Sequence, residues 1–314
     1  MDNNYIQLCA EMAYNDVLIE SYFEEDILTE ANNINFKDKV KKFFEGIIIF
    51  IKNLFNKVIT FLKDCVKKIK EKLSKKKDKE AKNESTSLYF NIIGMLLNEE
   101  FEYGKDVSKF CQDASEYVNY RYTKLTDSYV ELYEDIHKIS GKASDEIRRM
   151  LHIVGYDSMM KEISHSDKVK IESIISSMER DIKEKQDLFL KDSIEYLPQT
   201  SYLEKLENNI GSSSTKDDKS EDKVIEWFLK EVHSQENSVK KALDSINKNY
   251  KNLLQLDSEN FRRDIKSDFF GYMQKINVAE YGAEIKITKE FASTLSKIEQ
   301  SYIYIGSYAI KYYV

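Results

Sequence analysis

Residues 36–79 of this 314-residue chain read FKDKVKKFFEGIIIFIKNLFNKVITFLKDCVKKIKEKLSKKKDK, and this stretch decides the fold class. Large apolar residues recur there at steps of three and four, from Phe36 and Val40 to Ile69 and Leu73. Residues with this spacing share one side of a helix that has 3.6 residues per turn. Lysines fill most of the positions between them. The stretch therefore predicts one long, basic, amphipathic helix.

Charge is segregated along the chain. Residues 37–79 contain fifteen lysines and five acids, a net charge of +10, whereas the whole chain carries −7 and its remainder therefore −17. Residues 1–30 contain eight acids and no Lys or Arg. This acidic leader has weak helical spacing. It can fold back over the basic helix and cover it, or it can be an ordinary short helix that packs on the same core.

The basic helix does not have the composition of a membrane span. Only residues 46–51, GIIIFI, are apolar on all sides, and a span needs roughly 20 such residues. A secretory signal would carry positive charge before its apolar region, and residues 1–30 carry none. The sequence thus predicts neither a transmembrane span nor a signal peptide.

Several interpretations of the basic helix remain. It can be a core helix with a solvated lysine face, an interfacial helix on an anionic membrane, or a helix that docks on protein partners. Nucleic acid is a less favoured partner, because the stretch lacks arginine and its aromatic residues lie on the apolar face. The candidate membrane- or partner-binding residues are Phe43, Phe44, Ile47, Ile51, Leu54, Phe55, Val58, Phe61 and Leu62, with Lys41, Lys42, Lys52, Lys57, Lys63 and Lys67.

The scarcity of turn-forming residues favours long helices throughout. The chain has nine Gly and one Pro, Pro198, whereas strand-rich folds need many turns marked by these residues. We therefore expect an all-α protein, in which the basic helix accompanies an elongated helical bundle.

Two segments show the heptad spacing of coiled coils or long bundle helices. The first comprises Val118, Tyr122, Leu125, Tyr129, Leu132, Ile136 and Ile139, and the second Val239, Leu243, Ile246, Tyr250 and Leu253. We expect the first helix to break at Ser140-Gly141-Lys142, and a new one to begin with Ile147, Leu151 and Val154. A further helix carries Ile171, Ile175, Met178, Ile182 and Phe189 and ends before Pro198.

The C-terminal residues are harder to interpret. Ala283–Thr288 alternates like a short strand, but can also be the entrance to a helix with Thr288 as its cap. Residues 301–314 are predicted to be a buried or self-associating helix. The expected organisation is an acidic leader (1–30), the basic amphipathic helix (31–79), a first bundle part (80–210), a linker (211–222) and a second bundle part (223–314).

No constellation of catalytic residues stands out. The chain contains no GxGxxG, GxxxxGK[ST], HExxH, GxSxG or EF-hand pattern. Its three cysteines are far apart, without CxxC spacing, and are predicted to be reduced structural thiols. No two histidines have metal-ligand spacing. We therefore expect a non-enzymatic protein without a cofactor or a metal.

Residues 20–80 resemble internal or head-associated virion proteins of large tailed bacteriophages. The resemblance rests on an acidic leader ending in Ile27-Leu28-Thr29-Glu30-Ala31, followed by the basic helix and a lysine run. In such phages a prohead protease cuts after Leu-x-Glu or Ile-x-Glu triplets. The resemblance implies processing at Leu28, Glu30 and Ala31, with cleavage after Glu30. The triplet also occurs at Ile69-Lys70-Glu71, Leu132-Tyr133-Glu134 and Ile182-Lys183-Glu184.

The function expected from these observations is that of a virion-associated helical protein with a membrane-interacting helix. It would be located in the phage particle, or in the host cytoplasm or at the host membrane surface. Its partners would be an anionic membrane, other helices, virion proteins or further copies of itself. An α-helical pore-forming or membrane-remodelling protein is one alternative, and a purely structural scaffold is another.

Overall fold

The computed structural model describes residues 36–77, 107–199, 240–248 and 267–313, together with positions 226, 229, 230 and 237. These described residues form helices and no strand, which confirms the prediction of an all-α protein. The acidic leader with its processing site, the segment after Lys79 and the linker at 211–222 lie outside the described residues. Most of the second predicted heptad helix also lies outside them.

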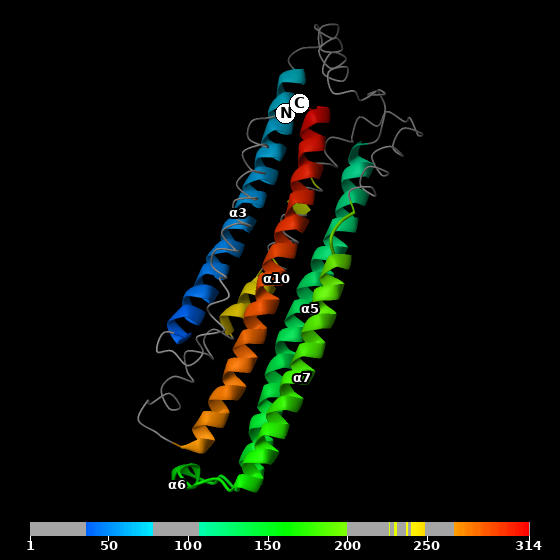
Figure 1. Ribbon diagram of the computed structural model, residues 1–314. Coiled ribbons are helices and arrows are strands. Elements are labelled where there is room, and N and C mark those ends of the chain that lie inside the picture. The colour runs from blue at the N-terminus through cyan, green and yellow to red at the C-terminus, as the bar shows by residue number, and fades with distance from the viewer. Residues whose placement is uncertain are drawn as a thin grey trace.

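Four long helices and one short helix make up the described bundle. They are α3 (Phe36–Lys77), α5 (Val107–Met150), α6 (Tyr156–Met159), α7 (His165–Glu195) and α10 (Asp268–Tyr313). The long helices lie side by side, and α10 packs against α3, α5 and α7 (Figure 1). A helical segment at 240–248 adds the buried residues Ala242 and Ile246 to the core. The central element of the fold is thus α10 rather than the basic helix.

The predicted heptad face of α5 is buried, but the predicted break at Ser140-Gly141-Lys142 is wrong. The helix continues through these residues to Met150. Ser140 and Ala143 are themselves buried and extend the spacing from Ile136 to Ile147. A glycine inside a helix costs about 1 kcal/mol relative to alanine. The buried residues that precede and follow Gly141 in the helix pack into the core, and this packing outweighs the local cost.

The prediction that Leu151 and Val154 belong to a further helix is also wrong. After Met150 the chain turns at His152, whose φ of 52° is left-handed. The Ile153 amide donates to the Arg148 carbonyl and the His152 amide to the Arg149 carbonyl, as in a Schellman motif. Glycine usually occupies this left-handed position after a helix, so the sequence did not indicate that a helix ends just before His152. Val154 is 94% exposed in the loop that follows.

The helix predicted before Pro198 is confirmed as α7. Its five predicted apolar residues, Ile171, Ile175, Met178, Ile182 and Phe189, are all buried. The Ser164 hydroxyl caps the helix by accepting a hydrogen bond from the Asp167 amide over 3.1 Å. The helix ends at Glu195.

Residues 283–288 are neither a strand nor a helix entrance. They lie inside α10, and five of the six are buried, with Lys286 exposed. A helix that is packed on several sides loses the one-sided pattern by which an amphipathic helix is recognised. The predicted helix at 301–314 is confirmed as far as Tyr313, and Ile303 is buried.

Candidate functional site: the basic helix and the acid–tyrosine cluster

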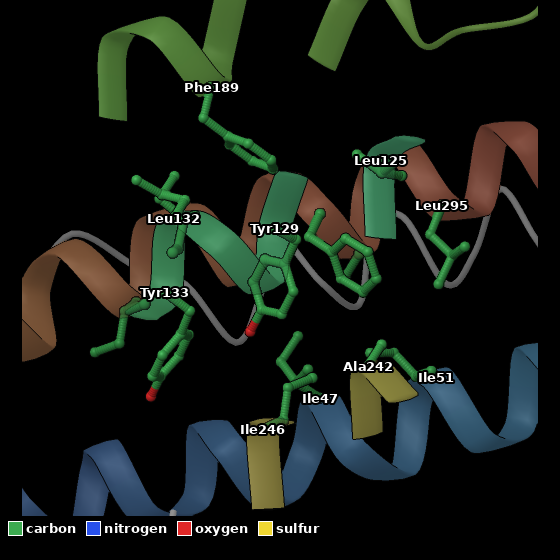
Figure 2. Packing of buried hydrophobic residues seen from close by; sticks show 14 of the residues in the cluster. Ile47, Ile51, Leu125, Tyr129, Leu132, Tyr133, Phe189, Ala242, Ile246 and Leu295 are labelled. Carbon is green, nitrogen blue, oxygen red and sulfur yellow. The ribbon is translucent and has the colours of Figure 1, made fainter. Parts of the chain in front are cut away.

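The apolar face of α3 is part of the protein core. Eight of the nine apolar candidate residues are buried, and Phe61 is half-buried. Figure 2 shows Ile47 and Ile51 pointing from α3 toward the core residues of α5 and the 240–248 segment. Among the labelled helices, α3 packs mainly against α10. In this conformation the apolar candidate residues therefore bind the protein's own helices.

The lysine face of α3 points outward. Lys42, Lys52, Lys63 and Lys67 are exposed, and Lys41 and Lys57 are partly exposed. Residues 41–71 contain eight lysines and three acids, a net charge of +5 on a chain of net −7. The basic candidate residues are thus available to an anionic surface while the apolar face is covered.

The close approach of α3 to α10 depends on Gly306. A Cβ atom at this position would lie 2.7 Å from Cε1 of Phe61 and 3.4 Å from Sγ of Cys65. Cys65 and Cys111 are both fully buried, and neither forms a disulfide, which agrees with the prediction of structural thiols for these two cysteines. Burial raises the pKa of the Cys65 thiol to about 12. The thiol is therefore both covered and protonated at neutral pH.

A group of buried polar residues joins α5 to α10. We call Tyr129, Tyr133, Glu280, Glu284 and Thr288 the acid–tyrosine cluster. The Tyr129 and Thr288 hydroxyls are hydrogen-bonded over 2.9 Å in the core. The Tyr129 ring stacks on Phe291, with ring centroids 4.3 Å apart. Burial raises the pKa of Tyr129, so its hydroxyl stays neutral.

Glu284 is a buried carboxyl group within this cluster, with 4% of its surface exposed. Burial and the nearby Glu280 raise its pKa well above the usual range. The Tyr133 hydroxyl lies beside it without a hydrogen bond of standard geometry and offsets part of this rise. Burial and the nearby carboxyl groups raise the pKa values of Tyr133 and Tyr281. Burial between α5 and α10 thus favours the protonated form of the Glu284 carboxyl group.

Glu280 sits at the edge of the cluster, where it meets solvent-facing His137. Nδ1 of His137 lies 2.8 Å from Oε1 of Glu280. This hydrogen bond raises the pKa of His137 above its ordinary value. Because the His137 side chain is 66% exposed, solvent screens the pair and its contribution to stability is small.

Helix α7 is tied to α10 on the same side of the bundle. Nε2 of Gln186 donates to the backbone carbonyl of Ala283 over 3.1 Å. The Ser193 hydroxyl lies 3.2 Å from Oε1 of Glu290. These contacts supplement the apolar packing between α7 and α10.

No group of three metal-ligating side chains occurs among the described residues. The open depression lined by Asn237, Lys240, Asp244 and their neighbours lies on one helical segment and does not reach the acid–tyrosine cluster. No described helix is long and apolar enough to cross a membrane.

Sequence reasoning did not identify the acid–tyrosine cluster. A usable signal was present, since Glu280 and Glu284 lie four residues apart in the stretch Val278–Ile287, in which Lys286 is the one other charged residue. Acids on the same side of a buried helix point to a shared polar environment.

Comparison with protein-family models, curated proteins and solved structures finds no match for this chain.

Proposed function

We propose that this chain is a non-enzymatic helical protein that binds anionic membranes through α3. The observation that carries the proposal is the arrangement of α3: a covered apolar face on α10 and an outward lysine face. Each lysine near an anionic membrane contributes about 1 kcal/mol. The outer face of α3 can therefore hold the closed bundle at such a surface.

Release of α3 would be the second step. Thirteen side chains of α3 are buried, from Phe43 to Ile69. Burial of one large apolar side chain contributes about 1.5–3 kcal/mol, so exposing this face to water costs on the order of 20 kcal/mol. The helix therefore leaves α10 only where lipid or a partner helix takes over its apolar face. An interfacial membrane helix meets this requirement.

A disulfide latch tests the release step. Gly306→Cys places a thiol next to Cys65, and Phe61→Ala removes the ring that would collide with it. Cys9→Ser in all variants limits other pairing. The oxidised protein should bind anionic vesicles through its lysines without causing dye leakage or inserting α3. The reduced form of the same protein should insert α3 into the membrane. The matched control carries Cys65→Ser in addition, so that it cannot form the disulfide.

The outcomes separate the alternatives. Binding to anionic but not neutral vesicles, with insertion only after reduction, supports the proposal. Dye leakage from the reduced form would favour the pore-forming or membrane-remodelling alternative. A protein that binds neither vesicle and forms elongated oligomers would contradict membrane binding and favour a structural scaffold.

We further propose a phage particle as the setting, on the basis of the resemblance of residues 20–80 alone. Cleavage after Glu30 would remove the acidic leader and increase the net positive charge near α3. The mass of the chain in purified mature particles tests this step. A chain that begins at Ala31 supports processing, and one that still begins at Met1 contradicts it.

A further inference from the structure

A row of polar side chains crosses the interface between α5 and α10. It consists of the acid–tyrosine cluster together with His137, and we call these six residues the polar row. Along the row, Tyr129 faces Thr288, Tyr133 lies beside Glu284, and His137 contacts Glu280. Each step of four residues forward on α5 matches a step of four residues back on α10. Because residues four apart share one helical face, the three pairs form one continuous row, and Figure 2 shows Tyr129 and Tyr133 on the same side of α5.

The polar row leads from solvent into the core. At its outer end, the His137 side chain is 66% exposed. Glu280 is 9% exposed and Glu284 4%, and Tyr129 at the inner end is fully buried. Water can therefore exchange protons with His137 directly. Glu280 and Glu284 sense the resulting change of charge in a medium of low dielectric constant, where charges interact more strongly than in water.

The Tyr133 hydroxyl equips the middle of the row for reversible proton binding. Its oxygen is buried and makes no hydrogen bond of standard geometry with the described residues, although the Glu284 carboxyl group is its neighbour. A phenol can accept a hydrogen bond from a protonated carboxyl group and can donate one to a carboxylate. Tyr133 can therefore serve as the partner of Glu284 both with the proton and without it.

The titratable groups around Glu284 on α5 and α10 are acids and phenols. They are Glu280, Tyr281, Tyr129 and Tyr133. Neither an acid nor a phenol can supply positive charge. Burial and the nearby Glu280 raise the pKa of Glu284. This carboxyl group therefore holds its proton at a pH at which exposed carboxyl groups are ionised.

The other elements around Glu284 leave the control of charge to His137. Helix α7 meets α10 here through the uncharged Gln186, which donates to the Ala283 carbonyl. Helix α3 meets the core with apolar side chains and directs its lysine face outward. On the 240–248 segment, Lys248 opposes the protonation of His137. Within the polar row itself, His137 is the one member whose side chain can become positively charged.

We propose that the polar row is a buried proton-binding site: Glu284 holds the proton, and His137 controls through Glu280 how tightly it is held. When His137 is protonated, its charge offsets that of the Glu280 carboxylate, and Glu284 releases the proton more readily. When His137 is neutral, the Glu280 charge acts in full on Glu284, which retains the proton. Withdrawal of the proton places two carboxylates side by side in the buried interface and loosens α5 from α10. The site needs neither a membrane nor the release of α3.

Carbon-13 NMR of the glutamate side-chain carboxyl groups tests the site in the full chain. Exposed glutamates titrate near pH 4.3, so a carboxyl signal that still titrates above about pH 7 belongs to a buried acid. Glu284→Gln should remove one such signal and thereby identify it. Glu179→Gln, at an exposed position on α7, should leave this signal in place. A Glu284 signal that titrates below about pH 5 overturns the proposal.

Charge substitutions at the outer end of the row test the control by His137. His137→Lys fixes a positive charge there and should lower the midpoint of the Glu284 titration by roughly one pH unit, because a nearby opposite charge favours the carboxylate. Glu280→Gln removes the like charge and should lower the midpoint by a similar amount. His137→Gln resembles the neutral histidine and should leave the midpoint unchanged at alkaline pH.

The matched control is Lys138→Gln, which changes a charge on the exposed surface of α5 next to His137. It should shift the Glu284 midpoint far less than His137→Lys does. His137 is itself exposed, so its substitution should leave the fold intact. Equal midpoints in the wild type, His137→Lys and Glu280→Gln overturn the control by His137. A shift in Lys138→Gln as large as that in His137→Lys overturns it as well.

Hydrogen exchange measures whether the proton holds the interface closed. After correction for the intrinsic exchange rate, the protection of amides in residues 126–140 and 278–292 should fall by up to about tenfold for each unit of rising pH. In Glu284→Gln it should stay constant. Protection that does not depend on pH in the wild type, or that falls equally in Glu284→Gln, overturns the proposal. An equal fall for residues 44–62 of α3 would indicate global unfolding and contradict a local role.

Discussion

The Tyr129 hydroxyl on α5 and the Thr288 hydroxyl on α10 form a hydrogen bond 2.9 Å long inside the apolar core. Both residues are buried, Tyr129 at 0% exposure and Thr288 likewise. Water cannot replace either partner there. The pair therefore fixes the register of α5 against α10 more specifically than apolar packing alone.

A double-mutant cycle tests this pair. Tyr129→Phe leaves the Thr288 hydroxyl without its partner and should lower the free energy of unfolding by about 1–3 kcal/mol. Adding Thr288→Val removes the remaining polar group and should restore part of the loss. Urea unfolding provides the measurement, with exposed Tyr120→Phe as the control. Strictly additive losses would contradict a direct interaction.

Glu284 should make the bundle less stable as the pH rises. Its pKa is raised in the folded protein, so above the unfolded-state pKa, about 4.3, the folded state binds more protons than the unfolded one. Stability then falls with pH by up to about 1.4 kcal/mol per unit, until the pH reaches the folded-state pKa. Glu280, Tyr133 and Tyr281 are the titratable neighbours.

Glu284→Gln should remove this pH dependence and stabilise the protein at pH 8. Thermal unfolding between pH 5 and 8 gives the comparison, and Glu179→Gln on the exposed surface is the control. A wild-type protein whose stability rises over this range would contradict a protonated Glu284.

The His137–Glu280 pair should be visible by NMR. The hydrogen bond raises the pKa of His137 above 6.5, and Glu280→Gln should bring it down. The pair's contribution to the free energy of unfolding is present at low pH, and it is lost as the pH rises through the raised pKa of His137. His165, which is exposed on α7, gives an internal reference. Identical titrations before and after the substitution would rule out the contact.

Two glycines should respond oppositely to alanine. Gly306→Ala places a methyl group 2.7 Å from the Phe61 ring and should destabilise the protein by about 1–3 kcal/mol. Gly141→Ala meets no atom within 4 Å and should stabilise α5 by about 1 kcal/mol. Adding Phe61→Ala to Gly306→Ala should recover part of the loss. Urea unfolding of the four proteins measures these changes.

Cys65 should report the release of α3. Its buried thiol, with a pKa raised to about 12, should react slowly with iodoacetamide at pH 8, since the thiolate is the nucleophile. Anionic vesicles should accelerate its labelling if α3 leaves α10. Mass spectrometry locates the label, and Cys111 on α5 is the internal control. Equal acceleration at both cysteines would indicate general unfolding instead.

The spacing of apolar residues within each segment correctly predicted α7 and the buried faces of α3 and α5. Each of these helices has one strongly apolar side, such as the run from Ile171 to Phe189 on α7, and burial follows that side directly. Errors arose where local signals conflicted with packing. Gly141 signalled a break inside α5, while the left-handed His152 ended the helix without the expected glycine.

The acid–tyrosine cluster could not be assembled from sequence, because its members come from distant parts of the chain. Tyr129 and Thr288, which are hydrogen-bonded, are 159 residues apart. Nothing in the spacing of Tyr129 or Tyr133 indicates which helix they face. The exposure of Val154 was missed for a related reason. Val154 fits a helical spacing with Ile147 and Leu151, and only the turn at His152 shows that it projects into solvent.

The sequence by itself determined the helical class, the long basic helix and which of its sides is apolar, because these depend on residue periodicity within one segment. It could not decide what covers that side. Tertiary structure made α10 the centre of the bundle, with α3 packed on it and the buried Glu280 and Glu284 close to Tyr133 of α5. The physical reason is that burial depends on neighbours far away in the chain: α10 is packed against three helices at once, and no periodicity within α10 encodes which three they are.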